Sequence, residues 1–332
     1  MAVSRILVTG SNGLVGRALS QALIADGHAV TGLVRHAGGC VEGVREWLYE
    51  GRDFASLANA AWPEVDCVVH LAARVHVMYD TAADPDAAFR STNVEGTLRV
   101  AEAARRHGVR RLVFVSSIKA IAEGDRGLPL GEDDPARPED AYGRSKYEAE
   151  QALRKFGDAS GLDVVIVRPP LVYGPDVRAN FLRMMGAVWR GVPLPLGAVV
   201  ARRSLVYVDN FADALLHCAT DLRAARGCFH VADDNALSVT ELLCMLGDAL
   251  GKPARLFPVP DSFLRALGKL TGRGAAIDRL TGSLQLDTSH IRQVLDWQPP
   301  YSTRQGLEAT AAWYRSRDTR QKSICVSPLP RG

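Results

Sequence analysis

The fold is decided by residues 8–16, which read Val8-Thr-Gly-Ser-Asn-Gly-Leu-Val-Gly16. This stretch joins an expected β-strand, residues 5–9, to an expected helix, residues 14–25, whose apolar side chains recur on one face. In such a turn the first glycine permits the tight bend, the second lets a pyrophosphate approach the backbone, and the third lets helix and strand pack closely. We therefore predict a dinucleotide-binding turn with phosphate at the helix N-terminus, made by Gly10, Gly13, Leu14 and Gly16.

The first half of the chain alternates short apolar runs with amphipathic stretches. We expect strands at 5–9, 29–34, 66–71, 111–116 and 163–167, and helices at 14–25, 87–107 and 141–156. Near-continuous apolar strands separated by helices predict a parallel sheet that is covered on both faces. The fold class is therefore α/β, a doubly wound parallel sheet of the Rossmann type.

The composition of the chain changes after Arg168, where Pro and Gly clusters occur at 168–170, 174–175 and 192–197. We predict a dinucleotide-binding domain at 1–168, a smaller C-terminal substrate lobe at 169–316, and a flexible tail at 317–332. Within the lobe we expect helices at 239–250, 261–270 and 304–315, and strands at 205–208 and 228–231 that return to the main sheet.

Composition excludes several classes of function. The 332 residues include 40 basic and 37 acidic side chains that are interspersed, so we expect no nucleic-acid partner. No leader pattern opens the chain and no run reaches about 18 apolar residues, so we expect no membrane partner and a cytoplasmic location. The six cysteines include no Cys-x-x-Cys pair, which favours reduced thiols and no metal site.

The second strand lacks the acidic residue that usually hydrogen-bonds the adenosine ribose of NAD, because Val34 is followed by Arg35 and His36. Arg35 suits a ribose 2′-phosphate instead, which favours NADP and leaves NAD open. We expect Asp53 to hold the adenine. Leu71 and Ala72 end the fourth strand with residues beside which the cofactor backbone can lie.

Tyr142 and Lys146 lie four residues apart on an expected helix, so their side chains share a face. Ser117 precedes Tyr142 by 142 − 117 = 25 residues and ends the fifth strand. A free phenol titrates near pH 10, and a nearby ammonium, helped by an oxidised nicotinamide, is expected to lower that value. We predict that Ser117, Tyr142 and Lys146 transfer a proton at a substrate oxygen, and that Lys146 also binds the nicotinamide ribose.

With these motifs the chain resembles the extended short-chain dehydrogenases/reductases of the nucleotide-sugar epimerase/dehydratase group, over about residues 4–316. The matching segments are 8–16, 70–73, 93–97, 115–117, 142–146, 168–175 and 203–209. The resemblance implies a Ser117, Tyr142 and Lys146 triad, NAD or NADP at the glycine turn, and a homodimer. It also implies that Asn180 and Arg203 bind the diphosphate and sugar of a UDP-sugar.

Sugar 4,6-dehydratases of this group carry an Asp-Glu pair where this chain has Ile118-Lys119, so dehydration is disfavoured. Lys119 is either a contact for a substrate acyl or phosphate group or an ordinary surface lysine.

Residues 116–119, 168–175 and 193–197 are most similar to bacterial O-antigen reductases. This similarity implies NAD(P)H-dependent reduction of the C4 keto group of a UDP-linked 2-acetamido-2,6-dideoxy-4-ketohexose, giving a product of the N-acetylquinovosamine type for cell-surface polysaccharide. The alternative is an NAD-dependent UDP-hexose or UDP-N-acetylhexosamine 4-epimerase, which uses the same triad and needs no net reductant. A non-catalytic dinucleotide sensor is the third hypothesis, and retention of the whole triad speaks against it.

Overall fold

The computed structural model describes residues 3–51, 53–75, 84–272 and 274–326. Its centre is a seven-stranded sheet in the order β10-β6-β5-β4-β1-β2-β3, and every neighbouring pair is parallel. The strands are β1 (Arg5–Thr9), β2 (Ala29–Val34), β3 (Arg45–Leu48), β4 (Cys67–His70), β5 (Arg111–Val115), β6 (Asp163–Arg168) and β10 (Cys228–His230). The predicted doubly wound α/β fold is confirmed.

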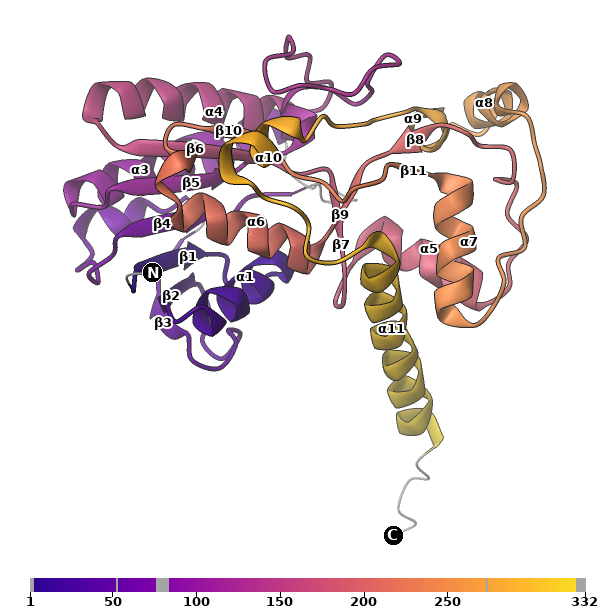
Figure 1. Cartoon of the computed structure of the whole chain (residues 1–332), viewed down its shortest axis with the longest axis horizontal. Helices are drawn as coiled ribbons and strands as arrows, with labels where there is room; N and C mark the ends of the chain where they lie inside the picture. Colours follow the sequence, from indigo (N-terminus) through magenta and orange to yellow (C-terminus); the bar gives the residue numbers. More distant parts are fainter. Residues whose placement is uncertain (1–2, 52, 76–83, 273, 327–332) are drawn as a thin grey trace.

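Helices cover both faces of this sheet (Figure 1). Helices α1 (Leu14–Ala25) and α6 (Val208–Thr220) pack together on one face, whereas α3 (Gly96–Arg106) and α4 (Ala141–Ser160) lie on the other. Alternation along β1 explains the two layers, because Ile6 and Val8 belong to the core under α1 while Leu7 belongs to the core under α4. Burial on both sides explains why these strands read as unbroken apolar runs.

The single helix expected at 87–107 is divided in the structure. It consists of α2 (Pro85–Arg90), a π-helical turn (Ser91–Glu95) and α3. Single π-helical turns inside helices occur frequently at functional sites. Helix α4 begins at its N-cap Asp140, whose carboxylate accepts the Gly143 N–H, and it ends at Gly161 with a left-handed φ of 74°.

The lobe leaves the sheet after β6, and the chain returns in β10, which pairs with β6 as predicted for 228–231. The expected strand at 205–208 does not join the sheet: β9 (Leu205–Tyr207) pairs with β7 (Leu171–Tyr173), and β8 (Arg202–Arg203) pairs with β11 (Leu237–Ser238). Helices α5 (Ala179–Trp189), α7 (Val239–Leu250), α8 (Asp261–Leu270), α9 (Gly274–Thr281) and α10 (Ser289–Leu295) complete this part.

Helix α11 (Thr303–Val326) extends away from the body of the molecule (Figure 1). It continues through 317–326, where we expected a tail, while 327–332 lie outside the described residues. Within the described part of the chain, no helix combines the length and apolar character that crossing a bilayer would require.

Candidate active site

The glycine turn forms a cradle between β1 and α1. Gly10 has a φ of +70°, and the Gly13 N–H donates to the Gly10 carbonyl at 2.9 Å. A Cβ on Gly16 would lie 2.2 Å from the Gly10 carbonyl oxygen, so only glycine lets α1 come this close to the turn. Gly13 is the N-cap of α1 and supplies no side chain. The cradle therefore fits a pyrophosphate at the helix N-terminus.

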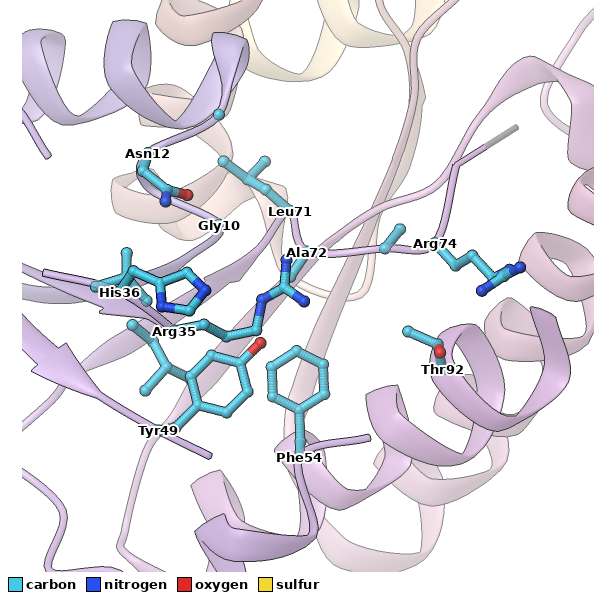
Figure 2. A pocket seen from close by; sticks show the side chains of 14 residues that line it. Gly10, Asn12, Arg35, His36, Tyr49, Phe54, Leu71, Ala72, Arg74 and Thr92 are labelled. Carbon is cyan, nitrogen blue, oxygen red and sulfur yellow. The ribbon is translucent and has the colours of Figure 1, made fainter. Parts of the chain in front are cut away.

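Beside this turn lies a nucleotide pocket of about 370 Å³. Figure 2 shows the rings of Tyr49 and Phe54 side by side on its floor, stacked with centroids 5.0 Å apart. Its lining comes from the carboxyl ends of β1, β2 and β4, where an open parallel sheet binds ligands. The lining residues are Gly10, Asn12, Gly13, Leu33, Val34, Arg35, His36, Tyr49, Phe54, Leu71, Ala72, Ala73, Arg74 and Thr92.

The charged lining of the nucleotide pocket is basic. The Arg35 side chain extends across the pocket toward the Tyr49 hydroxyl, with His36 beside it (Figure 2), and no carboxylate belongs to the lining residues. The Arg74 guanidinium points away from the glycine turn (Figure 2) and lies 5.4 Å from the centre of the Phe89 ring. The lining therefore fits a dinucleotide, with Arg35 as its cation next to the adenosine half.

Four of the residues predicted for the cofactor lie outside this lining: Leu14, Gly16, Asp53 and Lys146, whose ammonium binds the Val115 carbonyl instead. The Asp53 carboxylate accepts from the Arg99 guanidinium at 2.7 Å and its neighbour Phe54 lines the pocket, so the adenine contact of Asp53 stays a prediction. Leu14 packs against the core, and Gly16 acts through close packing rather than by lining the pocket. Sequence analysis did not identify Tyr49, although an aromatic residue directly after β3 is a usable signal.

The predicted triad comes together at the ends of β5 and α4. Ser117 follows β5, and its side chain hydrogen-bonds that of Tyr142. Lys146 is only 2% exposed, its Nζ donates to the Val115 carbonyl at 2.7 Å, and it lies 4.5 Å from the centre of the Phe114 ring. Helix α4 thus presents the phenol and the ammonium on one face, as their spacing predicts.

In the cofactor-free chain the pKa of Tyr142 lies above its ordinary value, and the predicted lowering, which depends on an oxidised nicotinamide, stays a prediction. Burial raises the pKa of Tyr142 to about 12; the Ser117 hydrogen bond lowers it, and the Asp140 charge raises it further. Burial also lowers the pKa of Lys146 to about 7, so this residue is only partly charged at neutral pH. A buried ammonium loses its hydration, which explains why the expected cationic neighbour does not make the phenol acidic here.

A buried ion pair lies one turn further along α4. Glu150 is 0% exposed and Arg168 is 3% exposed, and their side chains form a forked interaction with N···O distances of 2.6 and 3.0 Å. Arg168 also donates to the Glu132 carbonyl at 2.8 Å. The Glu150 charge raises the pKa of Lys146, in opposition to burial. Within this pair it is therefore the Glu150 carboxylate that favours the charged form of Lys146.

Lys146→Met is expected to stabilise the cofactor-free protein while abolishing turnover. Between the folded pKa of about 7 and the ordinary 10.5, the unfolded chain holds more protons than the folded chain, so Lys146 costs most stability at pH 7 and below. The difference between 10.5 and about 7 amounts to about 5 kcal/mol at about 1.4 kcal/mol per pKa unit, and the lost hydrogen bond offsets about 1 kcal/mol, so we expect a gain of about 4 kcal/mol at pH 7. Urea unfolding should show this gain shrinking as the pH approaches 10.5; a gain that does not depend on pH would contradict the explanation.

A buried hydrogen-bond chain starts beneath the nucleotide pocket. The Thr9 hydroxyl accepts two backbone N–H groups, of residues 71 and 72, at 3.1 Å, so its own hydrogen must go to His70 Nδ1 at 2.8 Å. His70 Nε2 then carries the ring proton and donates to Thr97 at 3.1 Å, and Thr97 donates to the Asn93 carbonyl at 2.7 Å. Burial lowers the pKa of His70 to about 3, which keeps the ring neutral.

The same chain reaches helix α4. The Asn93 side chain, in the π-helical turn, binds both the N–H and the carbonyl of Arg74 and donates to Ser145 Oγ at 2.9 Å. Ser145 donates to the Tyr142 carbonyl at 2.8 Å. The loop that lines the nucleotide pocket is therefore tied to the helix that carries Tyr142.

A second pocket, of about 360 Å³, lies between the sheet and the lobe. Residues that lie far apart in the sequence line this pocket together. They are Ser117, Lys119, Tyr142, Asn180 and Arg203. The remaining lining is Ile118, Glu123, Pro170, Leu171, Phe181, Met184, Ser204, Leu205, Leu237, Val239, Leu242, Arg279, Leu280 and Leu284. We call this the substrate pocket. Among the described residues no group of three or more His, Cys, Asp or Glu side chains could hold a metal ion.

Two charged residues of the substrate pocket were missed. Burial lowers the pKa of Arg203 most, the Glu123 and Asp125 charges oppose this, and the charge of Arg279, which lines the pocket from α9, lowers the pKa further. Glu123 accepts from Lys119 at 2.6 Å, and Lys119 also binds Asp140 at 2.7 Å. Lys119 thus lines the substrate pocket while two carboxylates hold its ammonium, and its contact with a substrate group stays a prediction. Only the folded chain brings these charges together.

Comparisons with known proteins agree with this geometry. Residues 6–231 match the model of the NAD dependent epimerase/dehydratase family. The chain is 40% identical over 320 residues to a UDP-glucose 4-epimerase of Vibrio cholerae, covering 95% of this chain and 97% of the relative. It is similar to the crystal structure of a Thermus thermophilus UDP-glucose 4-epimerase in complex with NAD (26% identity, TM-score 0.74, covering 94% and 99%). A UDP-N-acetylglucosamine 4-epimerase from Bacillus cereus shares the fold (22% identity, TM-score 0.76, covering 94% and 99%).

Proposed function

Because the chain belongs to the NAD dependent epimerase/dehydratase family, we propose that it inverts C4 of a UDP-linked hexose or N-acetylhexosamine. The observation that carries the proposal is the substrate pocket, where Tyr142 and Ser117 share one lining with Asn180 and Arg203. The named activity of the Vibrio cholerae relative supports this reaction over the reduction that the sequence motifs favoured.

Tyr142 is the residue that exchanges a proton with the C4 oxygen. Its phenolate oxygen accepts the proton as C4 becomes a ketone, and the phenol so formed returns the proton when the alcohol forms again, while Ser117 hydrogen-bonds the same oxygen. When bound, the nicotinamide supplies hydride chemistry at C4. Lys146 holds the nicotinamide ribose from its buried position next to Val115. Its ammonium form and the charge of an oxidised nicotinamide both favour the phenolate, which opposes the raised pKa of Tyr142 in the cofactor-free chain.

The diphosphate of the substrate is assigned to the two guanidinium groups of the substrate pocket. Arg203 and Arg279 both line it, and Arg203 is fixed by a hydrogen bond to the Gly282 carbonyl at 2.8 Å. Guanidinium groups bind phosphate oxygens in a forked manner. The apolar lining from the lobe gives the nucleoside a surface on which to pack.

A C4 reductase is the second candidate, and the lining of the nucleotide pocket is the observation that favours it. Arg35 and His36 stand where an acid would bind the adenosine ribose of NAD. This lining suits the 2′-phosphate of NADPH, a cofactor that a reductase consumes and exchanges. An epimerase keeps one NAD and needs no supply of reductant.

Turnover without reductant distinguishes the two candidates. We expect purified protein with a catalytic amount of NAD to convert UDP-glucose or UDP-N-acetylglucosamine to its galacto epimer. The NMR signal of the C4 proton measures this conversion. The control is the same mixture with NADPH and a UDP-4-keto-6-deoxyhexosamine, in which a reductase consumes one NADPH per product. If product forms only in the second mixture, the protein is a reductase and the epimerase proposal is wrong.

A further inference from the structure

The reacting end of the substrate pocket carries a charged cluster, made of Lys119, Glu123 and Asp140. The Lys119 ammonium lies 2.6 Å from Glu123 Oε1 and 2.7 Å from Asp140 Oδ2. Two carboxylates on one ammonium leave this cluster with a formal charge of −1. The Asp140 carboxylate also caps α4 through the Gly143 N–H, so its position is fixed by the helix that carries Tyr142.

The cluster faces the place where the sugar reacts. Lys119 and Glu123 line the substrate pocket together with Tyr142, and the Glu123 side chain is 15% exposed. The Asp140 charge acts on the Tyr142 hydroxyl, raising its pKa. Arg203 and Arg279 are the other charged lining residues, and the Glu123 charge is near enough to Arg203 to raise its pKa against the effect of burial, so the proposal assumes that the substrate diphosphate occupies the two guanidinium groups. The pocket thus has two cations for a diphosphate, and a net negative group beside the catalytic phenol.

We propose that Glu123 determines which sugars this pocket accepts, so that neutral hexoses bind and hexuronates, which carry a carboxylate, are rejected. The proposal rests on the assignment of a UDP-sugar to this pocket. A sugar carboxylate here would approach the Glu123 carboxylate, which lines the pocket and shares the Lys119 ammonium with Asp140. Like charges a few ångströms apart in a partly buried site repel strongly, because little water screens them.

Glu123→Gln should relax this discrimination. The substitution keeps the size of the side chain and makes the cluster neutral. Calorimetric Kd values for UDP-glucose and UDP-glucuronate should show that the wild-type protein binds UDP-glucuronate at least about tenfold more weakly. In Glu123→Gln most of this gap should close through tighter UDP-glucuronate binding. The ratio of the two Kd values is the quantity to compare, because any change in the binding of the shared UDP part alters both Kd values equally.

The matched control is Glu139→Gln, which also removes one carboxylate close to the start of α4. Glu139 is exposed and is not among the residues that line the substrate pocket, so the Kd ratio should not change. Lys119→Gln tests the same mechanism in the opposite direction, because it leaves a formal charge of −2 and should widen the gap.

The outcomes separate two kinds of failure. Wild-type protein that binds neither UDP nor UDP-glucose overturns the proposed function and this inference together. Wild-type protein that binds UDP-glucose and UDP-glucuronate equally well overturns only the inference, and so does an unchanged ratio in Glu123→Gln. A Glu123→Gln protein with lowered thermal stability still reports the ratio, since both ligands are measured on the same sample.

Discussion

Replacing Tyr142 by phenylalanine is expected to lower kcat for the UDP-sugar about a thousandfold. The variant loses the hydroxyl that exchanges the C4 proton but keeps the ring, which packs edge-on against Phe89. Dinucleotide affinity should be unchanged, because Tyr142 does not line the nucleotide pocket. Turnover measured by NMR, together with fluorescence titration of the dinucleotide, checks both expectations.

Tyr147→Phe is the matched control, since Tyr147 lies on the same helix and lines neither pocket. We expect it to keep wild-type turnover. Should Tyr142→Phe keep more than about a tenth of the wild-type rate, the phenol is not the proton-transfer group.

Glu150→Gln is expected to lower the free energy of unfolding by about 3–5 kcal/mol, the cost of leaving one partner of a buried ion pair unpaired. Arg168, at 3% exposure, would keep its charge without the opposing carboxylate. Loss of Glu150 also removes the charge that raises the pKa of Lys146, so that pKa should fall further. Urea unfolding at pH 7 measures the first effect.

The double variant Glu150→Gln, Arg168→Met serves as the control for this prediction. It removes both charges, and a well-packed apolar replacement of a buried pair is often neutral. We expect it to recover most of the lost stability. Equal destabilisation of the single and double variants would show that packing, rather than the unpaired charge, sets the cost.

The sequence predicted the central sheet well because burial on both faces leaves an unbroken apolar run in each strand. The glycine turn was equally readable, since Gly16 is required by an approach of backbone to backbone within one short segment. The spacing of Tyr142 and Lys146 placed them correctly on one face of α4. Each of these inferences depends on local periodicity or spacing.

The features that the sequence did not show are contacts between distant segments. The ion pair of Asp53 with Arg99, 46 residues away, cannot be read from the sequence. The raised pKa of Tyr142 in the cofactor-free chain could not be predicted either, because desolvation depends on the folded surroundings of this residue. Arg279 and Glu123 enter the substrate pocket from a late helix and a loop without any motif. Helix α11 continued past the expected end, where the sequence lacks apolar periodicity.

The direction of β1 has a practical consequence for attaching this protein to a support. Arg5 begins the strand at the amino edge of the sheet, whereas the nucleotide pocket lies beyond its carboxyl end. Five extended residues separate the two edges by about 17 Å. A bead or sensor chip linked through the first residues would therefore hold the molecule with its ligand entrances directed away from the matrix.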